Sequence, residues 1–137
     1  MPKDESIKVL NNCTAGVLGV IDKNGFPYTV PMSYAYEEGR IYLHSAQEGH
    51  KIDCIKNNNK VSFCVIEKDE IVQKEFTTRF RSVCLFGRAA FVTDGPKKRR
   101  ALDFLVQKYF PDYSVEAEEV IRKGWDEVCL IEIIIKH

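Results

Sequence analysis

One short stretch of the chain carries polar residues whose types and spacing suit the binding of an anion. Residues 41–51 run from an apolar segment through Ser45 to His50 and Lys51. A helix is predicted to begin at this point, and extra cations are disfavoured there because the amino terminus of a helix already carries partial positive charge. A phosphate would remove this conflict, held by backbone N–H groups, the Ser45 hydroxyl, His50 and Lys51. The alternative is that both side chains point into water.

The elements that must position these residues follow from the hydrophobic pattern. An Asn-Gly pair within 22–25 lies between β-branched and aromatic runs, which predicts a β-hairpin. Apolar residues three apart predict helices, and alternation predicts strands. The predicted helices are Lys3–Leu10, Gly49–Asn57, Pro96–Phe110 and Ser114–Arg122, the last capped by Ser114; the predicted strands are Thr14–Ile21, Phe26–Tyr36, Arg40–His44, Val61–Ile66, Phe80–Val92 and Val128–Ile135, with Glu67–Gln73 as a loop or strand margin.

This order of elements favours a mainly β fold. Roughly six strands that follow one another as meanders, interrupted by short helices, are typical of an antiparallel barrel whose open ends the helices cover. We prefer this architecture to a sandwich. The 137 residues fit one domain, residues 1–137, since domains commonly have about 100–150 residues.

Composition excludes several partners. The 20 basic and 20 acidic residues cancel, so no positive field would collect nucleic acid, and the run Lys97–Arg100 is interpreted as a solvated helix face. No stretch approaches the roughly 18 apolar residues that a membrane span needs. The first six residues lack the pattern of a secretion signal, so we expect a cytosolic protein.

The cysteines do not indicate a metal site. Their number is odd, five, and no C-x-x-C pair occurs, which argues against both zinc and a disulfide framework. We expect reduced thiols that pack as small hydrophobic groups. Trp125 is likewise expected in the core, and no metal ligands are assigned.

The segments around the anion-binding stretch resemble a known family. Gly25–Tyr34, Ile41–Ala46 and Gly49–Lys51, followed by Arg79–Ala89 as a long central strand, are similar to the nitroimidazole-resistance (Nim) family of the pyridoxamine-5′-phosphate-oxidase-like split barrels. The resemblance extends over Cys13–Ile135. It implies a split β-barrel that binds FMN at two equivalent sites along the interface of a homodimer.

The resemblance also implies which residues contact the cofactor. The phosphate would lie at His50 and Lys51. Pro31 independently favours an edge strand or bulge, where backbone groups remain free for a ligand. The other implied contacts are Val30, Pro31, Met32 and Ser33 beside the isoalloxazine ring, His44, Ser45 and Ala46 on the ribityl and phosphate side, and Ser82 and Val83 from the long strand.

The favoured function is that of a flavin-dependent oxidoreductase. FMN would take hydride from NADH or NADPH and pass electrons to a small acceptor such as a nitroaromatic. The oxidases that make pyridoxal phosphate carry further basic residues on the strand matching Thr29–Tyr34, and their absence here disfavours a phosphorylated substrate. No residue is assigned as acid or base. His44 is expected beside the cofactor, with a proton donor or haem ligand as alternatives.

Two other functions remain open at this point. The chain would bind flavin or haem without turnover, as a carrier or redox sensor, or it would be a dimeric structural domain with an empty groove. Steady-state oxidation of a nicotinamide separates the first of these from a reductase.

Overall fold

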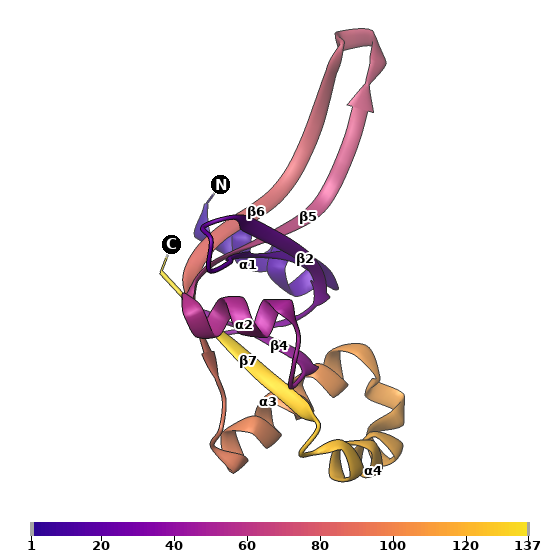
Figure 1. Ribbon diagram of the computed structural model, residues 1–137. Coiled ribbons are helices and arrows are strands. Elements are labelled where there is room, and N and C mark those ends of the chain that lie inside the picture. The colour runs from indigo at the N-terminus through magenta and orange to yellow at the C-terminus, as the bar shows by residue number, and fades with distance from the viewer. Residues whose placement is uncertain (1, 137) are drawn as a thin grey trace.

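The computed structural model describes the backbone of residues 2–136 and the side chains of these residues except 68–72 and 77–80. Seven strands in this part of the chain form one antiparallel sheet, in the order β2-β1-β5-β6-β7-β4-β3. The sheet curls into a half-barrel with flanking helices (Figure 1), which confirms the predicted mainly β split barrel. The strands are β1 (Ala15–Ile21), β2 (Pro27–Ser33), β3 (Ala35–Glu37), β4 (Arg40–Ala46), β5 (Lys60–Val72), β6 (Thr77–Phe91) and β7 (Val128–Ile135); the α-helices are α1 (Lys3–Asn12), α2 (His50–Asn57), α3 (Gly95–Tyr109) and α4 (Ser114–Gly124).

The predicted hairpin between β1 and β2 is confirmed. The Asp22 carboxylate accepts hydrogen bonds from the backbone N–H groups of Asn24 and Phe26, at 2.8 and 2.9 Å. Gly25 has a φ of 85°, a left-handed conformation that glycine adopts without a steric penalty. Local turn chemistry therefore sets the register in which β2 lies at one edge of the sheet.

The stretch predicted as one strand, Phe26–Tyr36, is two strands. It breaks at Tyr34, whose backbone N–H donates to the hydroxyl of Tyr109 at 2.9 Å instead of to a neighbouring strand. The Tyr34 side chain is fully buried, and its hydroxyl donates to the Leu10 carbonyl at 2.5 Å. As a result, β2 and β3 lie at opposite edges of the same sheet.

Residues 67–72, which the sequence predicted as a loop or strand margin, belong to strand β5, and Gln73 begins a short 3-10 helix. β5 continues to Val72 and pairs with β6, which begins at Thr77, after an irregularity between Ile66 and Lys68. A neighbouring strand supplies this pairing, and strand preference depends strongly on such context. The two strands form a long hairpin that extends away from the rest of the molecule (Figure 1).

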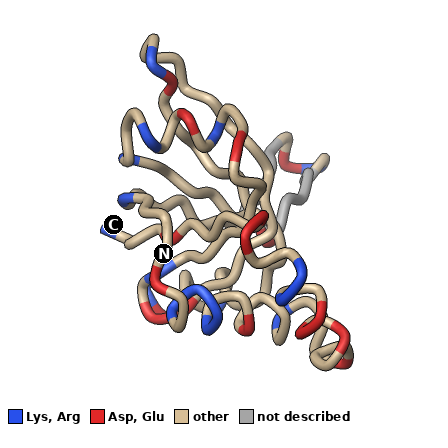
Figure 2. The backbone as a smooth tube through the Cα atoms, turned by 60° about the horizontal axis from the view of Figure 1, so that its bottom comes forward, with Lys and Arg blue, Asp and Glu red and all other residues tan. Residues whose placement is uncertain are grey.

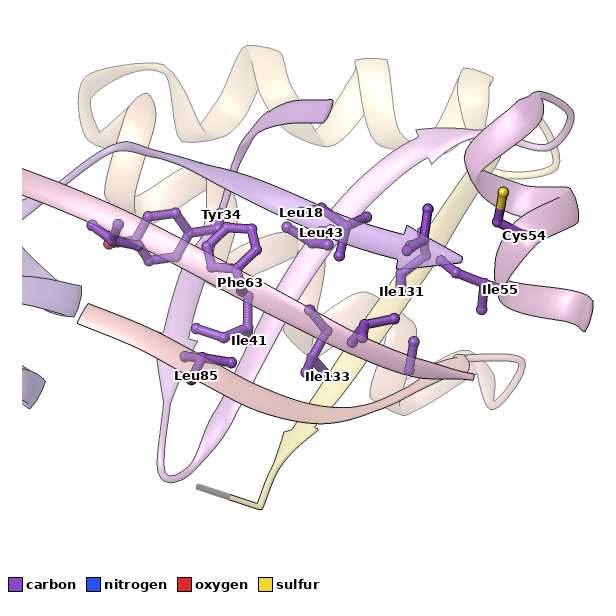
Figure 3. Packing of buried hydrophobic residues seen from close by; sticks show 14 of the residues in the cluster. Leu18, Tyr34, Ile41, Leu43, Cys54, Ile55, Phe63, Leu85, Ile131 and Ile133 are labelled. Carbon is purple, nitrogen blue, oxygen red and sulfur yellow. The ribbon is translucent and has the colours of Figure 1, made fainter. Parts of the chain in front are cut away.

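Two groups of buried side chains hold the layers together. The larger lies inside the curl of the sheet and includes Tyr34 and Phe63, whose rings meet edge to face at 5.2 Å (Figure 3). Helix α2 closes this side with Ile52 and Ile55. The smaller group lies between the sheet and α3 and contains Ala35, Tyr42, Ala101, Leu102, Leu105 and Leu130.

Helix α3 differs from its predicted solvated face at two lysines. Lys98 is buried: its ammonium group donates to the carbonyls of Trp125 and Val128 at 2.8 and 2.9 Å and lies 4.6 Å from the centre of the Trp125 ring. Lys97 pairs at 2.6 Å with the buried carboxylate of Glu132 on β7. Both contacts attach α3 to the sheet, which a helical projection of the sequence does not show.

Two smaller predictions also need correction. Asp94 caps α3 by accepting from the Lys97 N–H at 2.9 Å, but Ser114 lies inside α4 and makes no capping bond. Of the cysteines, Cys54 and Cys129 are buried as expected, whereas Cys84 is exposed because it lies on the outward face of β6.

Candidate functional site

The predicted phosphate residues lie at the start of α2. The helix follows Gly49, which has a φ of 146°, and no side chain caps its first N–H groups. His50 is exposed and packs edge-on against the ring of Tyr28 at 4.7 Å between centroids. Lys51 has no ion-pair partner among the residues whose side chains are described. This end of α2 therefore offers free donors and a free cation.

Ser45 and Ala46 precede this helix at the end of β4, which continues two residues beyond the predicted end at His44. The Ser45 hydroxyl donates to the Ala46 carbonyl at 3.0 Å. To donate to a phosphate, this hydroxyl would have to rotate, while its lone pairs remain accessible.

The β2 residues divide between the two faces of their strand. Val30 and Met32 pack against the core inside the curl. Pro31 and Ser33 alternate with them and are exposed on the opposite face. β2 is an edge strand, as Pro31 predicted.

Ser33 and His44 meet in one cavity, although 11 positions separate them in the sequence. The cavity measures about 380 Å³, within the range of small-molecule sites. His44 lies on the face of β4 that α3 and α4 cover, beside Tyr42 of the smaller core group. The remaining wall is mostly apolar and includes Leu102, Leu105, Val106, Phe110, Val120 and Ile121.

Tyr109 is a residue of this cavity that the sequence analysis assigned only to a helical apolar stripe. Its hydroxyl lies 2.6 Å from the Tyr34 carbonyl and 2.5 Å from the Thr14 carbonyl, and it also hydrogen-bonds with the Ser33 side chain. Burial raises the pKa of Tyr109, so its hydroxyl stays protonated at neutral pH. No local motif indicates this role, because the partners lie 75 and 95 positions away.

Lys108 adds a cation close to the same tyrosines. Its ammonium group donates to the Tyr34 carbonyl at 3.0 Å and lies 3.9 Å from the centre of the Tyr34 ring. Burial lowers the pKa of Lys108 and raises that of Tyr34.

Ser82 and Val83 lie apart from the other predicted site residues within one chain. Val83 lines a different cavity, beside α1, together with Leu10, Tyr36 and Ile135. Ser82 is exposed and pairs with Ile66 across the β5–β6 ladder. The structure thus brings Ser33 and His44 together and places the β2 edge against α2, but it does not bring β6 to either place.

Basic and acidic residues are interspersed along the described backbone (Figure 2). In the same part of the chain, no group of three or more His, Cys, Asp or Glu side chains comes together as a metal site. No helix among residues 2–136 is long and apolar enough to cross a membrane.

The sequence matches the model of a known protein family. Residues 2–132 match the sequence model of a family described as pyridoxamine 5′-phosphate oxidase. No curated protein sequence matches the chain.

Solved structures of the same fold come from several bacteria. A candidate 5-nitroimidazole antibiotic resistance protein from Bacteroides thetaiotaomicron is 28% identical, with 99% of this chain and 81% of that chain aligned and a TM-score of 0.81. An FAD-binding protein from Mesorhizobium loti is 26% identical, with 100% and 91% aligned and a TM-score of 0.69. An FAD- and haem-binding protein from Mycobacterium smegmatis is 18% identical, with 98% and 66% aligned and a TM-score of 0.82, and shows the fold alone.

Proposed function

Because the chain belongs to the pyridoxamine 5′-phosphate oxidase family, we propose that it binds FMN as a homodimer. With FMN bound, the chain would reduce a small oxidised acceptor, such as a nitroaromatic, with electrons from NADH or NADPH. The cytosol is the proposed location, as expected for a protein with reduced thiols.

The contact between β2 and the start of α2 carries this proposal. Tyr28 of β2 and His50 of α2 pack together at 4.7 Å, so the strand proposed to border the flavin ring adjoins the helix start proposed to hold its phosphate. These two elements are 22 positions apart in the sequence, counted from Tyr28 to His50. A cofactor with a phosphate at one end and a flat ring at the other fits this juxtaposition.

The residues present suit a flavin phosphate chemically. Uncapped N–H groups at a helix start attract anions, and Lys51, which has no ion pair among the described side chains, adds a full positive charge. The free edge of β2, interrupted by Pro31, leaves backbone groups for the polar rim of the ring. A relative with 26% identity is an FAD-binding protein, which supports a flavin as the cofactor class.

The position of Ser82 supports a second copy of the chain as a partner. Because β6 lies away from β2 and α2 within one chain, only another subunit brings Ser82 to a cofactor held there. Exposed apolar residues on the outward side of the sheet favour such an association, because soluble monomers rarely expose contiguous apolar patches. These residues are Val17, Ile66, Phe86 and Ile134.

Within this arrangement the chain binds and orients, and FMN when bound supplies hydride acceptance and electron donation. Lys51 and the α2 N–H groups hold the phosphate. The largely apolar cavity at Ser33 and His44 receives the acceptor. No side chain is proposed as an essential acid or base.

Haem binding is the second candidate, and the position of His44 is the observation that favours it. An exposed histidine beside a largely apolar cavity resembles an axial-ligand site. A relative of the same fold is an FAD- and haem-binding protein. A Soret band after haem addition that is lost in His44→Ala would establish this candidate.

Turnover is tested with purified protein, added FMN and a nitroaromatic acceptor. A reductase oxidises NADH or NADPH at a steady rate that depends on the acceptor. A flavin carrier or sensor binds FMN with no such oxidation, and that result would refute the proposed reductase activity while leaving the cofactor site in place.

A further inference from the structure

A second cavity lies between α2 and the start of α3, at the end of the sheet where β6 leads into α3. It measures about 380 Å³, within the range of small-molecule sites. Its wall combines apolar residues with polar ones, and the polar side chains are those of Gln47, Lys56, Thr93 and Lys98. Of its lining residues, Val128 alone also lines the cavity at Ser33 and His44.

Lys98 is a buried cation in this wall. Its side chain is 9% exposed, and its ammonium group donates to the carbonyls of Trp125 and Val128 at 2.8 and 2.9 Å. The face of the Trp125 ring, 4.6 Å away, adds attraction but no negative charge. Among the side chains that the structure describes, no carboxylate forms an ion pair with Lys98.

The chemistry of an ammonium group makes this arrangement incomplete. An ammonium has three N–H donors, and Lys98 uses two of them on carbonyls. A charge removed from water is costly unless an opposite charge compensates it. Lys98 therefore keeps a donor and a positive charge for a group bound in the cavity that it lines.

Lys56 brings a second cation to the cavity. It is exposed in the last turn of α2 and forms no ion pair with any side chain in the described part of the chain. The Cys129 thiol in the cavity wall senses both lysines: burial raises its pKa, and the charges of Lys98, Lys56 and Lys51 lower it. The electrostatic potential inside the cavity is therefore positive.

The neighbouring acidic residues are engaged elsewhere. Asp94 follows Thr93 directly, but its carboxylate caps α3 by accepting from the Lys97 N–H at 2.9 Å. Glu132 pairs with Arg40 and Lys97. Among the described residues, no acidic side chain lines the cavity. Its positive charge is thus available to an anion from solution.

The composition of the wall indicates the kind of anion. A phosphate dianion favours many donors, whereas the two lysines and the Thr93 hydroxyl match the fewer acceptors of a carboxylate. The apolar residues of the wall suit a short hydrocarbon body. We propose that this cavity binds a small organic acid, whose carboxylate contacts Lys98 and Lys56 while its body packs against Ile52, Phe91 and Leu130.

The cavity is separate from the surfaces that the proposed flavin function uses. Its lining residues do not include Val17, Ile66, Phe86 or Ile134, the exposed apolar residues assigned to the homodimer. The FMN phosphate is proposed at the start of α2, whereas Lys56 lies in its last turn. Binding of the acid therefore stands or falls independently of FMN.

The test titrates the purified protein, with the cofactor it carries and FMN added in excess, with butyrate. Proton–nitrogen correlation NMR spectra should show saturable shifts at the amides of Thr93 and Cys129, with His50 and Lys51 unaffected. Butyramide has nearly the same shape without the charge and should not bind. Inorganic phosphate should bind more weakly than butyrate.

Variants connect this binding to the two lysines. Lys56→Ala should raise the Kd for butyrate about threefold to tenfold, as expected for a partly solvated charge. Lys98→Met should abolish binding. Lys8→Ala is the matched control, because Lys8 is exposed on α1 outside the cavity and should leave the Kd unchanged. Lys56→Ala decides the question where Lys98→Met fails to fold.

Several results would overturn the proposal. These are the absence of saturable shifts, equal binding of butyramide, and tighter binding of inorganic phosphate than of butyrate. Shifts at His50 and Lys51 that excess FMN abolishes would also overturn it, because the acid would then occupy the proposed phosphate site. A protein that binds butyrate at Thr93 and Cys129 but takes up no FMN would refute the flavin site and support this one.

Discussion

At the scale of single residues, Lys51 is the side chain on which the proposed phosphate site depends most. Lys51→Ala should weaken FMN binding by about 1.5–3 kcal/mol, the range for hydrogen bonds to charged groups, or roughly ten- to more than a hundredfold in Kd. A fluorescence titration of FMN against the wild type and the variant measures this loss. Lys51 has no ion pair in the described structure, so the substitution should leave folding intact.

Lys56→Ala is the control for this variant. Lys56 lies in the last turn of the same helix, so its removal changes the net charge equally without touching the helix start. We expect a small, salt-dependent change in Kd. Equal losses for both variants would show that the phosphate lies elsewhere.

Tyr34 gives a prediction about pH. Burial raises the pKa of its phenol above the ordinary value, so the folded protein retains a proton that the unfolded chain releases near pH 10. The folded state therefore loses stability as the pH rises above about 10. Burial lowers the pKa of Lys108, which acts in the opposite direction in the same range.

Tyr34→Phe isolates the tyrosine contribution. The variant should be less stable at neutral pH by about 0.5–1.5 kcal/mol, because the hydrogen bond to the Leu10 carbonyl is lost. The difference from wild type should then shrink as the pH rises from 9 to 11. Urea denaturation at several pH values measures it, and a constant difference would contradict the argument.

At the scale of elements, Glu132 connects α3 to two strands. Its carboxylate is buried on β7 and pairs with Arg40 of β4 at 2.5 Å and with Lys97 of α3 at 2.6 Å. Glu132→Gln keeps the shape but removes the charge, and should lower the free energy of unfolding by about 1–3 kcal/mol. Both cations are partly exposed and can turn to water, which limits the loss.

Glu118→Gln is the comparison for this element. Glu118 pairs with Arg99 on the surface of α3 and α4, and exposed pairs contribute about 0–1 kcal/mol. Equilibrium unfolding in urea should therefore rank the two variants clearly. A similarly small change in the free energy of unfolding for both variants would show that the buried carboxylate of Glu132 does not stabilise the packing of α3 on the sheet.

The elements that depend on interactions between residues close in the sequence could be predicted from the sequence. The hairpin at Asp22–Gly25 and the capped start of α3 depend on side chains within four residues of one another. The break at Tyr34 could not be predicted, because its backbone partner is Tyr109, 75 positions later. The strand character of residues 67–72 likewise comes from pairing with β6 and not from their own composition.

In the candidate site, too, features set by neighbouring residues could be predicted, and features set by distant elements could not. The order of polar residues from His44 to Lys51 indicated where a strand leads into a helix, and the structure has that transition. The cavity that joins Ser33 with His44 required α3 and α4, whose packing against β4 no local pattern specifies. Only the order of the strands in the sheet shows that Ser82 lies apart from the other predicted site residues.

At the scale of the whole molecule, the proposed homodimer makes a prediction about the outward face of the sheet. Phe86 is 56% exposed on β6. Phe86→Lys should shift the sedimentation coefficient from dimer towards monomer, because a charged side chain cannot be buried there without a partner. FMN affinity should fall with it, because the site needs both subunits.

Phe26→Lys controls for loss of an exposed aromatic group, since Phe26 is 69% exposed at the β1–β2 turn. This variant should sediment as the wild type does. A monomeric wild-type protein that binds FMN normally would refute the homodimer while preserving the flavin site.

The most direct test of the central claim is the visible absorption spectrum of the purified protein, with identification of the released chromophore. We predict flavin bands near one FMN per chain, or their appearance after FMN is added. A Soret band would instead establish the haem candidate at His44. A colourless protein that takes up neither FMN nor haem would contradict the proposed cofactor site.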